Sequence, residues 1–377
     1  YLPDTCIVMG GPHVTSFPHE TMRDCPEADV SVPGDGELVL SELVERLERN
    51  EPYHDIAGIL FRNKRNQVVV TRSAKPLYNI DHLPQPDRGI YKDYNYTPLP
   101  TLHLPRPVTT MITSRGCPWA RCRFCYQGGP YASPYRRHTP QVVVAEMRRL
   151  RQNWGIRSVI FWDDSFCSND GWVEEFCELL EEAQLGIMWS VLVRANTVTR
   201  ARLETMARAG CRSIQFGFES GNQELLDFIR KGVTLQQMRD AVRWSKLAGL
   251  DVRGTFILGF PTETPEMSLR TIEFACDLNA DYVFFFPYHV LKGTSLEADA
   301  LAQGTLSHTN DVHKPSYVPN TYPDAETLAQ MVTYAYRRFY LRPRYWGRIA
   351  SRTIRRPKRV FNQFRMLLYW LHLVAHD

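Results

Sequence analysis

Six short apolar runs alternate with helical segments over the middle of this 377-residue chain. The runs cover residues 108–113, 158–162, 188–193, 213–218, 252–258 and 282–286. Two parallel strands cannot be joined by a tight turn, so strands that alternate with helices build a parallel sheet with the helices as crossovers. Six consecutive units predict an α/β fold, a partial (β/α)6 TIM-like barrel, with its ligand site at the carboxyl ends of the strands.

The helix boundaries in this region carry strong local signals. A threonine followed by proline begins two of the helices, and a threonine with a glutamine three residues later predicts a capping box at a third. Glycines supply the stops. The starts are Thr139-Pro140, Thr264-Pro265 and Thr234 with Gln237, and the stops are Gly210 and Gly249.

A glycine-bounded loop directly after the first of these strands carries three thiols, Cys117, Cys122 and Cys125. A structural zinc site normally takes four protein ligands, and the nearest histidine in sequence is His138. Three thiolates would leave one iron of a four-iron cluster open to a substrate or cofactor. The spacing favours an iron–sulfur site, with zinc and inert thiols as the alternatives.

The other cysteines are scattered, and the total of nine is odd. This usage does not favour a secreted disulfide framework, so we expect a reducing, cytoplasmic location. The longest apolar run, residues 366–374, is too short to span a bilayer of about 30 Å. A net charge of +4 does not by itself demand a nucleic acid or a membrane as partner.

The positive charge is concentrated near the C-terminus, where eleven Arg and Lys residues between 337 and 365 occur without one intervening acid. The simplest interpretation is a solvated basic helix that packs its aromatic residues against the barrel. Docking on anionic lipid or on an acidic substrate is the alternative, which would give a peripheral membrane contact. No RNA-binding module signature accompanies the basic run, so a nucleic-acid partner is not favoured.

The N-terminal stretch predicts half of a doubly wound domain. An apolar run at residues 5–9 ends in Gly10 and Gly11, and a second at 28–33 ends in Gly34 and Gly36, after which Glu37 opens an amphipathic helix through Leu38, Leu40, Leu43 and Leu47. Glycine loops of this kind let a backbone approach a phosphate closely, although ordinary loop glycines are the common alternative. Residues 56–71 predict a hairpin, and a proline-rich linker follows to residue 107.

The cysteine loop resembles the cluster motif of radical S-adenosylmethionine (SAM) enzymes, including an aromatic residue, Phe124, directly before the last cysteine. The resemblance implies that Cys117, Cys122 and Cys125 hold a 4Fe-4S cluster and that the amino and carboxylate groups of SAM bind the fourth iron. One departure is the spacing, because residues 118–121 place four residues between the first two cysteines where three is commonest.

The resemblance extends along the barrel and implies further SAM-binding residues. Asp163 and Asp164 would receive the amino group, with helix capping as their alternative role. Arg194 would meet the carboxylate, with a surface arginine as the alternative. Glu219 and Ser220 would approach the ribose, and Gly259 would lie near the adenine. The turn after the sixth strand, residues 287–294, also matches.

The front of the chain resembles the C-terminal half of the cobalamin-binding domain that precedes the barrel in one large subclass. Gly10, Gly11, Gly34, Gly36 and Glu37 would then flank the nucleotide tail of cobalamin. The subclass motif Asp-x-His-x-x-Gly is absent, and the chain begins at Tyr1, so we expect a fragment that binds cobalamin weakly by itself. The expected regions are 1–50 for this half-domain, 51–106 for hairpin and linker, 107–300 for the radical SAM barrel, and 301–377 for a basic helical region.

The implied function is a cobalamin-dependent radical SAM enzyme that cleaves SAM reductively to a 5′-deoxyadenosyl radical and methylates an unactivated carbon of a hydrophobic small molecule. A donor such as flavodoxin or ferredoxin would supply the electron. The close alternative is an oxidative ring cyclase of the magnesium-protoporphyrin ester type. A non-catalytic metal-binding scaffold with a basic RNA- or membrane-docking tail is a third hypothesis. Methylthio transfer to tRNA ranks low, because Cys6 and Cys25 do not provide for a second cluster.

Overall fold

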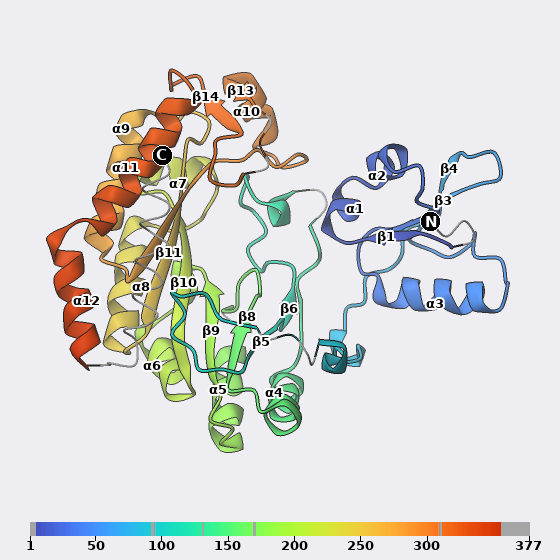
Figure 1. Ribbon diagram of the computed structural model, residues 1–377, viewed down its shortest axis with the longest axis horizontal. Coiled ribbons are helices and arrows are strands. Elements are labelled where there is room, and N and C mark those ends of the chain that lie inside the picture. Colours follow the sequence, from blue (N-terminus) through green and yellow to red (C-terminus); the bar gives the residue numbers. More distant parts are fainter. Residues whose placement is uncertain are drawn as a thin grey trace. The chain divides into compact units, whose positions relative to one another are not determined.

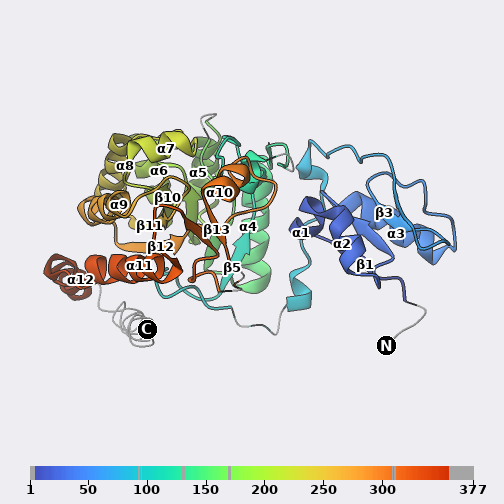
Figure 2. The same ribbon diagram turned by 90° about the horizontal axis from the view of Figure 1, so that it is seen from above.

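The computed structural model describes residues 5–91, 94, 96–129, 132–168, 171–307, 309 and 311–355 (Figures 1 and 2). These residues form two compact units. Unit 1 comprises the described residues up to Pro84 together with those of 130–136. Unit 2 comprises the described residues of 85–129 and from Arg137 onward. The part of the basic run beyond residue 355, including Arg356, Lys358, Arg359 and Arg365, lies outside the described residues.

Unit 1 is built on one four-stranded sheet in the order β1-β2-β3-β4. The first two strands pair in parallel and the last two form the predicted hairpin. The elements are β1 (Val8–Gly10), α1 (Pro12–Ser16), α2 (Pro18–Asp24), β2 (Val30–Val32), α3 (Glu37–Glu48), β3 (Leu60–Arg62), β4 (Val68–Val70) and the short 3-10 helix η1 (Ile80–His82).

Helix α3 packs on this sheet with a face that differs from the expected one. Val39 and Leu43 are buried against Val30 and Phe61, whereas Leu38 is 60% and Leu40 43% exposed. The sequence has apolar residues on several sides of this helix. The side that packs on the sheet is the one that carries Val39 and Leu43. The predicted amphipathic helix is therefore present, with Leu43 on its buried side and with Leu38 and Leu40 exposed.

Unit 2 contains the predicted parallel sheet. Its strands are β5 (Val108–Met111), β8 (Ser158–Phe161), β9 (Met188–Val193), β10 (Cys211–Glu219), β11 (Asp251–Leu258) and β12 (Tyr282–Pro287). They lie in the order β5-β8-β9-β10-β11-β12, and every pairing is parallel. The edge strands β5 and β12 do not pair with each other among the described residues, so the sheet is a partial barrel and the predicted fold class is confirmed.

Helices cover one face of this sheet (Figures 1 and 2). They are α4 (Pro140–Trp154), α5 (Trp172–Ala183), α6 (Arg200–Arg208), α7 (Gln223–Phe228), α8 (Leu235–Leu247), α9 (Pro265–Leu278) and α11 (Ala325–Tyr340). The predicted capping box at Thr234 and Gln237 is present, and Thr264 caps α9 by accepting a hydrogen bond from the Met267 N–H. One continuous apolar core fills the space between helices and sheet.

The remaining elements connect or flank the barrel. They are η2 (Arg88–Tyr91), β6 (Ser114–Arg115), η3 (Tyr126–Gly128), β7 (Arg136–Arg137), η4 (Ala195–Thr197), α10 (Glu297–Gln303), the antiparallel pair β13 (Gly304–Leu306) and β14 (Tyr317–Pro319), and α12 (Pro343–Arg355). Within the described ranges, no helix has the length and apolar character needed to cross a membrane.

Two arginines of the basic region bind the end of α9 instead of facing solvent. Arg342 donates a hydrogen bond of 2.5 Å to the Cys276 carbonyl, and Arg348 donates to the carbonyls of Asn279 and Ala280 at 2.7 and 2.8 Å. Carbonyls at a helix C-terminus lack intrahelical partners and carry partial negative charge, which explains the attraction. Part of the basic run therefore attaches the C-terminal helices to the barrel.

The other face of the sheet, which we call the inner face, is closed at the amino ends of the strands by residues 101–107. Leu102 and Leu104 pack against Val108, Ile160 and Met188 at the beginnings of three strands. Nearby, the ring Nε2 of His103 lies 2.7 Å from the hydroxyl of Tyr282 on β12. We call this segment the floor. It covers the inner face at the amino ends of the strands, so the inner face is open to a ligand at the carboxyl ends.

Candidate active site

The cysteine loop leaves β5 at the carboxyl end of the sheet, where the sequence placed it. Cys122 is buried and Cys117 and Cys125 are half-buried, and all three thiols are free. The backbone folds tightly here, because the Cys125 and Gly128 N–H groups donate to the carbonyls of Cys122 and Cys125 at 3.2 and 2.9 Å. A Cβ on Gly128 would lie 2.0 Å from the Cys122 carbonyl oxygen, so the turn requires glycine at this position.

The unusual spacing between Cys117 and Cys122 contains a docking residue, Trp119. Its indole Nε1 donates to the Arg230 carbonyl at 3.0 Å, and a Cβ on Gly232 would lie 2.2 Å from the indole ring. The guanidinium of Arg194 stacks on the same ring with its carbon 4.8 Å from the ring centre. The four intervening residues therefore attach the loop to the segment after α7.

Asp163, at the end of β8, fixes the entrance of the loop. Its Oδ1 accepts hydrogen bonds from the N–H and hydroxyl groups of Thr113 and of Ser114, at distances of 2.6 to 2.9 Å. Its Oδ2 is buried and has no hydrogen-bond partner. Burial raises the pKa of this carboxyl, and the hydrogen bonds oppose that rise.

Asp164 has different surroundings from its neighbour. Its carboxylate accepts one hydrogen bond of 2.8 Å, from the side-chain amide of Gln127 in the cysteine loop. Burial also raises its pKa. Neither carboxylate caps α5, whose N-cap residue is Gly171. The alternative role of the pair as helix caps is thus wrong.

A buried ion pair lies beside the loop at the end of β10. Lys231 Nζ donates to Glu219 Oε1 at 2.7 Å, and both side chains are less than one tenth exposed. Gly217 leaves room for the pair, because a Cβ there would lie 2.5 Å from that carboxylate oxygen and 3.1 Å from the ammonium. Glu219 itself takes a left-handed backbone with φ +67°, a costly conformation that turns its side chain inward.

Arg194 directly follows β9 and is buried, so its alternative interpretation as a surface arginine is wrong. Its Nη1 lies 3.7 Å from Cys122 Sγ, and Nη2 donates to the Lys231 carbonyl. Arg194 and Lys231 both lower the pKa of the Cys122 thiol, although burial raises it more strongly. Positive charge beside a thiol favours the thiolate, which is the metal-binding form.

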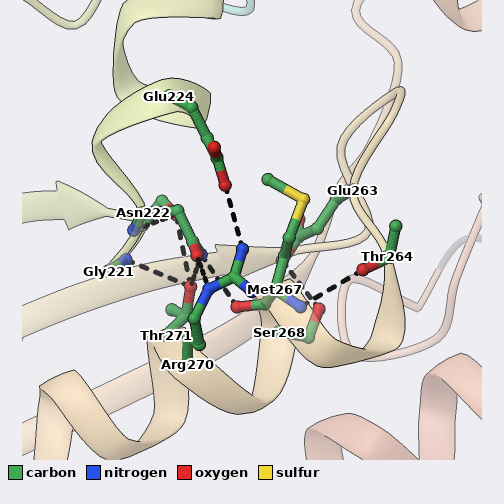
Figure 3. A network of polar contacts seen from close by, with 10 residues as sticks. Gly221, Asn222, Glu224, Glu263, Thr264, Met267, Ser268, Arg270 and Thr271 are labelled. Atoms are coloured by element: carbon green, nitrogen blue, oxygen red, sulfur yellow. Dashed lines mark hydrogen bonds and ion pairs between the residues drawn. The ribbon is translucent and has the colours of Figure 1, made fainter.

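A polar network around Asn222, Arg270 and Thr271 links the segment after β10 to α9 (Figure 3). Ser220 belongs to this network. Its hydroxyl is fully buried, lies 3.2 Å from the Thr271 hydroxyl and accepts from the Asn222 N–H at 3.1 Å. Arg270 donates to Asn222 Oδ1 at 2.6 Å and pairs with Glu224 at 2.9 Å. In this structure the Ser220 hydroxyl is thus engaged in holding the strand end against the helix.

Gly259 follows β11 and belongs to a second network, at whose centre is Glu263. Figure 3 shows the contact of Glu263 with Ser268. Glu263 Oε2 accepts from the Gly259 and Phe260 N–H groups at 2.9 and 3.0 Å, and Oε1 accepts from the Ser268 hydroxyl at 2.6 Å. The side chain is completely buried, and burial raises its pKa to about 7. Phe260 in turn packs edge-on against Phe124 of the cysteine loop, with ring centres 5.6 Å apart.

The structure therefore brings four of the predicted barrel residues to the cysteine loop or to its direct neighbours, namely Asp163, Asp164, Arg194 and Glu219. Ser220 instead contacts α9. Two further residues of this region, Lys231 and Glu263, were absent from the predicted site. Lys231 follows α7 in a turn whose sequence resembles any exposed turn, and no local pattern shows that it meets Glu219. Glu263 comes a few residues after the predicted fifth strand. Its carboxylate accepts a hydrogen bond from the N–H of Phe260, three residues earlier. This short separation in sequence was the signal that could have identified it.

The predicted residues of the front region belong to unit 1. Gly10 and Gly11 end β1, and Gly34 and Gly36 follow β2, so the parallel pairing brings their loops to one edge of the sheet. Gly11 and Gly34 have φ values of +99° and +83°, and the Gly34 N–H donates to the Thr15 hydroxyl at 2.9 Å. Glu37 is the first residue of α3.

No three His, Cys, Asp or Glu side chains within the described ranges converge on a point that would hold a single metal ion. A four-iron cluster makes a different demand, because each cysteine binds its own iron and the thiols stand apart. The residues present fit such a cluster with SAM: three free thiols share one tightly held loop, and the orphaned Oδ2 of Asp163 lies buried beside its entrance.

Comparison with known proteins agrees with this geometry. The sequence profile of the Radical SAM superfamily matches residues 111–275. A protein of Pyrococcus horikoshii named uncharacterized methyltransferase is 34% identical over 370 residues, which cover 95% of this chain and 79% of the relative. The anaerobic magnesium-protoporphyrin IX monomethyl ester cyclase of Rubrivivax gelatinosus is 28% identical over 348 residues, covering 90% of this chain but only 61% of the cyclase.

The fold also resembles that of a solved structure, the radical S-adenosylmethionine methyltransferase TsrM of Kitasatospora setae with cobalamin and a [4Fe-4S] cluster bound. The TM-score is 0.66 at 18% identity, and the alignment covers 89% of this chain and 65% of TsrM. At this identity the likeness concerns the fold.

Asp163→Ala is expected to weaken iron retention by the anaerobically reconstituted protein about tenfold, because a supporting residue of a metal site typically contributes that much. The change removes the acceptor of all four hydrogen bonds at the loop entrance. Iron content after gel filtration measures the effect. Asp164→Ala, which removes only the contact to Gln127, is the matched control, and equal iron loss in both variants would contradict the assignment.

Glu263→Gln is expected to change how stability depends on pH. A pKa of about 7 in the folded chain, against about 4.3 when unfolded, means that the folded state binds a proton between these values that the unfolded state has released. Wild-type stability therefore falls as pH rises through this window, by a contribution on the order of 3 kcal/mol. The glutamine variant lacks this contribution. Urea unfolding from pH 5 to 8 should show the variant gaining on the wild type, whereas a pH-independent difference would refute the assignment.

Proposed function

The chain belongs to the radical SAM superfamily of enzymes, and we propose that it is a cobalamin-dependent methyltransferase acting on an unactivated carbon of a hydrophobic small molecule. The observation that carries the proposal is the set of three free cysteines at the carboxyl end of β5 in a six-stranded parallel sheet. The Pyrococcus relative named a methyltransferase, which aligns with 95% of this chain, supports the reaction class.

Each cofactor has residues suited to hold it. Cys117, Cys122 and Cys125 would bind the cluster, and the free Oδ2 of Asp163 would accept from the ammonium of SAM. When bound, the cluster and SAM supply the radical chemistry of the superfamily, and cobalamin supplies a methyl carrier. Phe124 and Phe260 pack against each other and would give the cluster an apolar neighbour that excludes water from the reacting groups.

The other SAM contacts follow from charge and position. Arg194 is a buried cation beside Cys122 and would meet the carboxylate of SAM. Asp164 would assist Asp163 with the ammonium, while Glu219 would approach the ribose with Lys231 holding it in place. The backbone at Gly259 would lie near the adenine, and Ser220 would support this end of β10 from behind.

Cobalamin would contact unit 1 through the glycine loops after β1 and β2, where Gly10, Gly11, Gly34 and Gly36 leave the backbone open and Glu37 begins a helix. A Cβ on Gly11 or Gly34 would meet no atom within 4 Å, so space remains beside both loops. The solved methyltransferase of similar fold holds cobalamin, which supports this choice of cofactor. We propose regions 1–50, 51–106, 107–300 and 301–377 as half-domain, hairpin and linker, barrel, and basic helical region.

A ring cyclase is the second candidate function, because the Rubrivivax cyclase aligns with 90% of this chain. Both reactions begin with the same radical step, so they differ in substrate and in the fate of the substrate radical.

We further propose a cytoplasmic enzyme that receives its electron from a flavodoxin or ferredoxin. A peripheral membrane contact would use the basic C-terminus, whose apolar run at residues 366–374 lies outside the described residues.

Replacing any one of Cys117, Cys122 or Cys125 by alanine is expected to abolish 5′-deoxyadenosine formation from SAM, because each cysteine would ligate a different iron. The measurement is product analysis after anaerobic reconstitution and reduction, with iron and sulfide assayed in parallel. Cys25→Ala in unit 1 is the control and should leave both unchanged. One zinc and no iron in the wild type would instead support the non-catalytic scaffold.

Cobalamin binding is tested by absorbance titration of the full chain with hydroxocobalamin. We expect weak binding, since the described part of unit 1 offers one pair of parallel strands and two glycine loops to a large cofactor. Tight binding would contradict the view that these loops make only part of the contact surface. Val70→Ser on the exposed side of β4, distant in sequence from both loops, serves as the control variant.

A further inference from the structure

The inner face of the barrel carries polar groups that the proposed SAM and cluster contacts do not use. Strand alternation places Ser213 and Gln215 of β10 and Arg253 of β11 on this face, because their neighbours Ile214, Phe216, Val252 and Phe256 belong to the core beneath the helices. Gln215 is level with Arg253, and Ser213 is level with Ser190 on β9. These residues lie between the floor and the cysteine loop.

Arg253 has no counter-ion at bonding distance. The residue is only 3% exposed, its Nε has no hydrogen-bond partner, and no ion pair to its guanidinium occurs among the described residues. Among the described residues, the acid that acts on its charge is Asp251, which lies two residues earlier on the same face of the strand and is level with Ser213. Burial outweighs that attraction and lowers the pKa of Arg253 to about 10.

Two hydroxyls on the same face are also without partners. The Oγ atoms of Ser190 and Ser213 are buried and accept or donate no hydrogen bond, although both residues are at most 1% exposed. Buried polar groups are normally paired, and an unpaired buried charge costs several kcal/mol. Three unsatisfied groups on one face of a closed-bottomed barrel therefore point to a ligand that satisfies them.

We propose that Arg253 binds a carboxylate or phosphate of the substrate, with the Ser190 and Ser213 hydroxyls as additional partners, so that the substrate is an amphiphilic anion held on the inner face. Its apolar part would lie toward the loop end of the barrel, where Phe284 and Phe286 share this face half-buried. This inference rests on the proposed function for the identity of the inner face as the substrate site.

The spacing along the strands fits such a substrate. Arg253 is level with Leu192, and Arg194, which touches Cys122, is two residues further along β9. Two residues of strand span about 7 Å. An anion on Arg253 thus places carbons of the same molecule near the level of the cluster loop, while the charge itself stays away from the radical chemistry.

The test is calorimetric titration of the reconstituted full chain with octanoate, octyl phosphate and octanamide, which share one apolar tail and differ in charge. We expect at least one anion to bind about tenfold more tightly than the amide, and the better anion identifies the source of the negative charge. Arg253→Met should abolish this preference, so that the anion and the amide bind with about the same affinity. Arg243→Met, which changes an exposed arginine paired with Asp240, should retain it.

Several results would overturn the proposal. Equal affinity of the wild type for both anions and the amide does so without any variant, and so does an unchanged preference in Arg253→Met. If Arg253→Met loses affinity for SAM in parallel, the residue serves the cofactor and the proposal fails. If it melts well below the wild type yet retains the preference, Arg253 is structural and the proposal also fails.

The Arg253→Lys variant covers the case in which the methionine variant does not fold. It retains the charge without the planar fork, so we expect a reduced but measurable anion preference. Full retention of the preference for both anions, with unchanged ratios, would contradict recognition by a guanidinium.

The two proposals fail independently. If the wild type prefers the anions but forms no 5′-deoxyadenosine, only the proposed function is refuted. If it forms 5′-deoxyadenosine but shows no anion preference, only this inference is refuted.

Discussion

The carboxylate of Asp163 is the contact on which the site depends, because it joins the end of one strand to the entrance of the cysteine loop. One oxygen accepts four hydrogen bonds from Thr113 and Ser114, so the loop direction is fixed before any cofactor binds. A loop that lost this contact would have to order its three thiols during cluster assembly, at an entropic cost for each ordered residue. The arrangement leaves the second oxygen without a hydrogen-bond partner, so one side chain both shapes the loop and retains an acceptor for a ligand.

The rest of the loop is held by packing that only small residues permit. Gly128 allows the turn at Cys122, and Gly232 allows Trp119 to lie flat against the segment after α7. The residues between Cys117 and Cys122 thereby acquire a structural role, since Trp119 also stacks with Arg194. Arg194 contacts both Cys122 Sγ and the Lys231 carbonyl. A substitution of Trp119 would therefore shift Arg194 and alter the surroundings of the thiol and of the Glu219–Lys231 ion pair.

Much of this architecture follows from local sequence patterns. Apolar runs that alternate with helical segments, together with threonine caps, were enough to predict six parallel strands, because those signals arise within a few residues of the chain. Contacts between distant segments were not accessible in the same way: nothing near Lys231 shows that it meets Glu219, and nothing near Ser220 shows that Thr271 occupies its hydroxyl. The exposed Leu38 and Leu40 illustrate the same limit, since an apolar helix face is determined by the surface it meets.

The buried charges of the barrel divide into two kinds that serve different purposes. Lys231 and Glu219 neutralise each other at 2.7 Å, a paired arrangement that offsets the cost of removing both from water. Arg253 has been removed from water without such compensation. A chain selected only for stability would gain by an apolar residue at this position, because replacing an unpaired buried charge removes a penalty of several kcal/mol. The persistence of the guanidinium on the face below the cluster loop is therefore best explained by a ligand whose negative charge completes the pair.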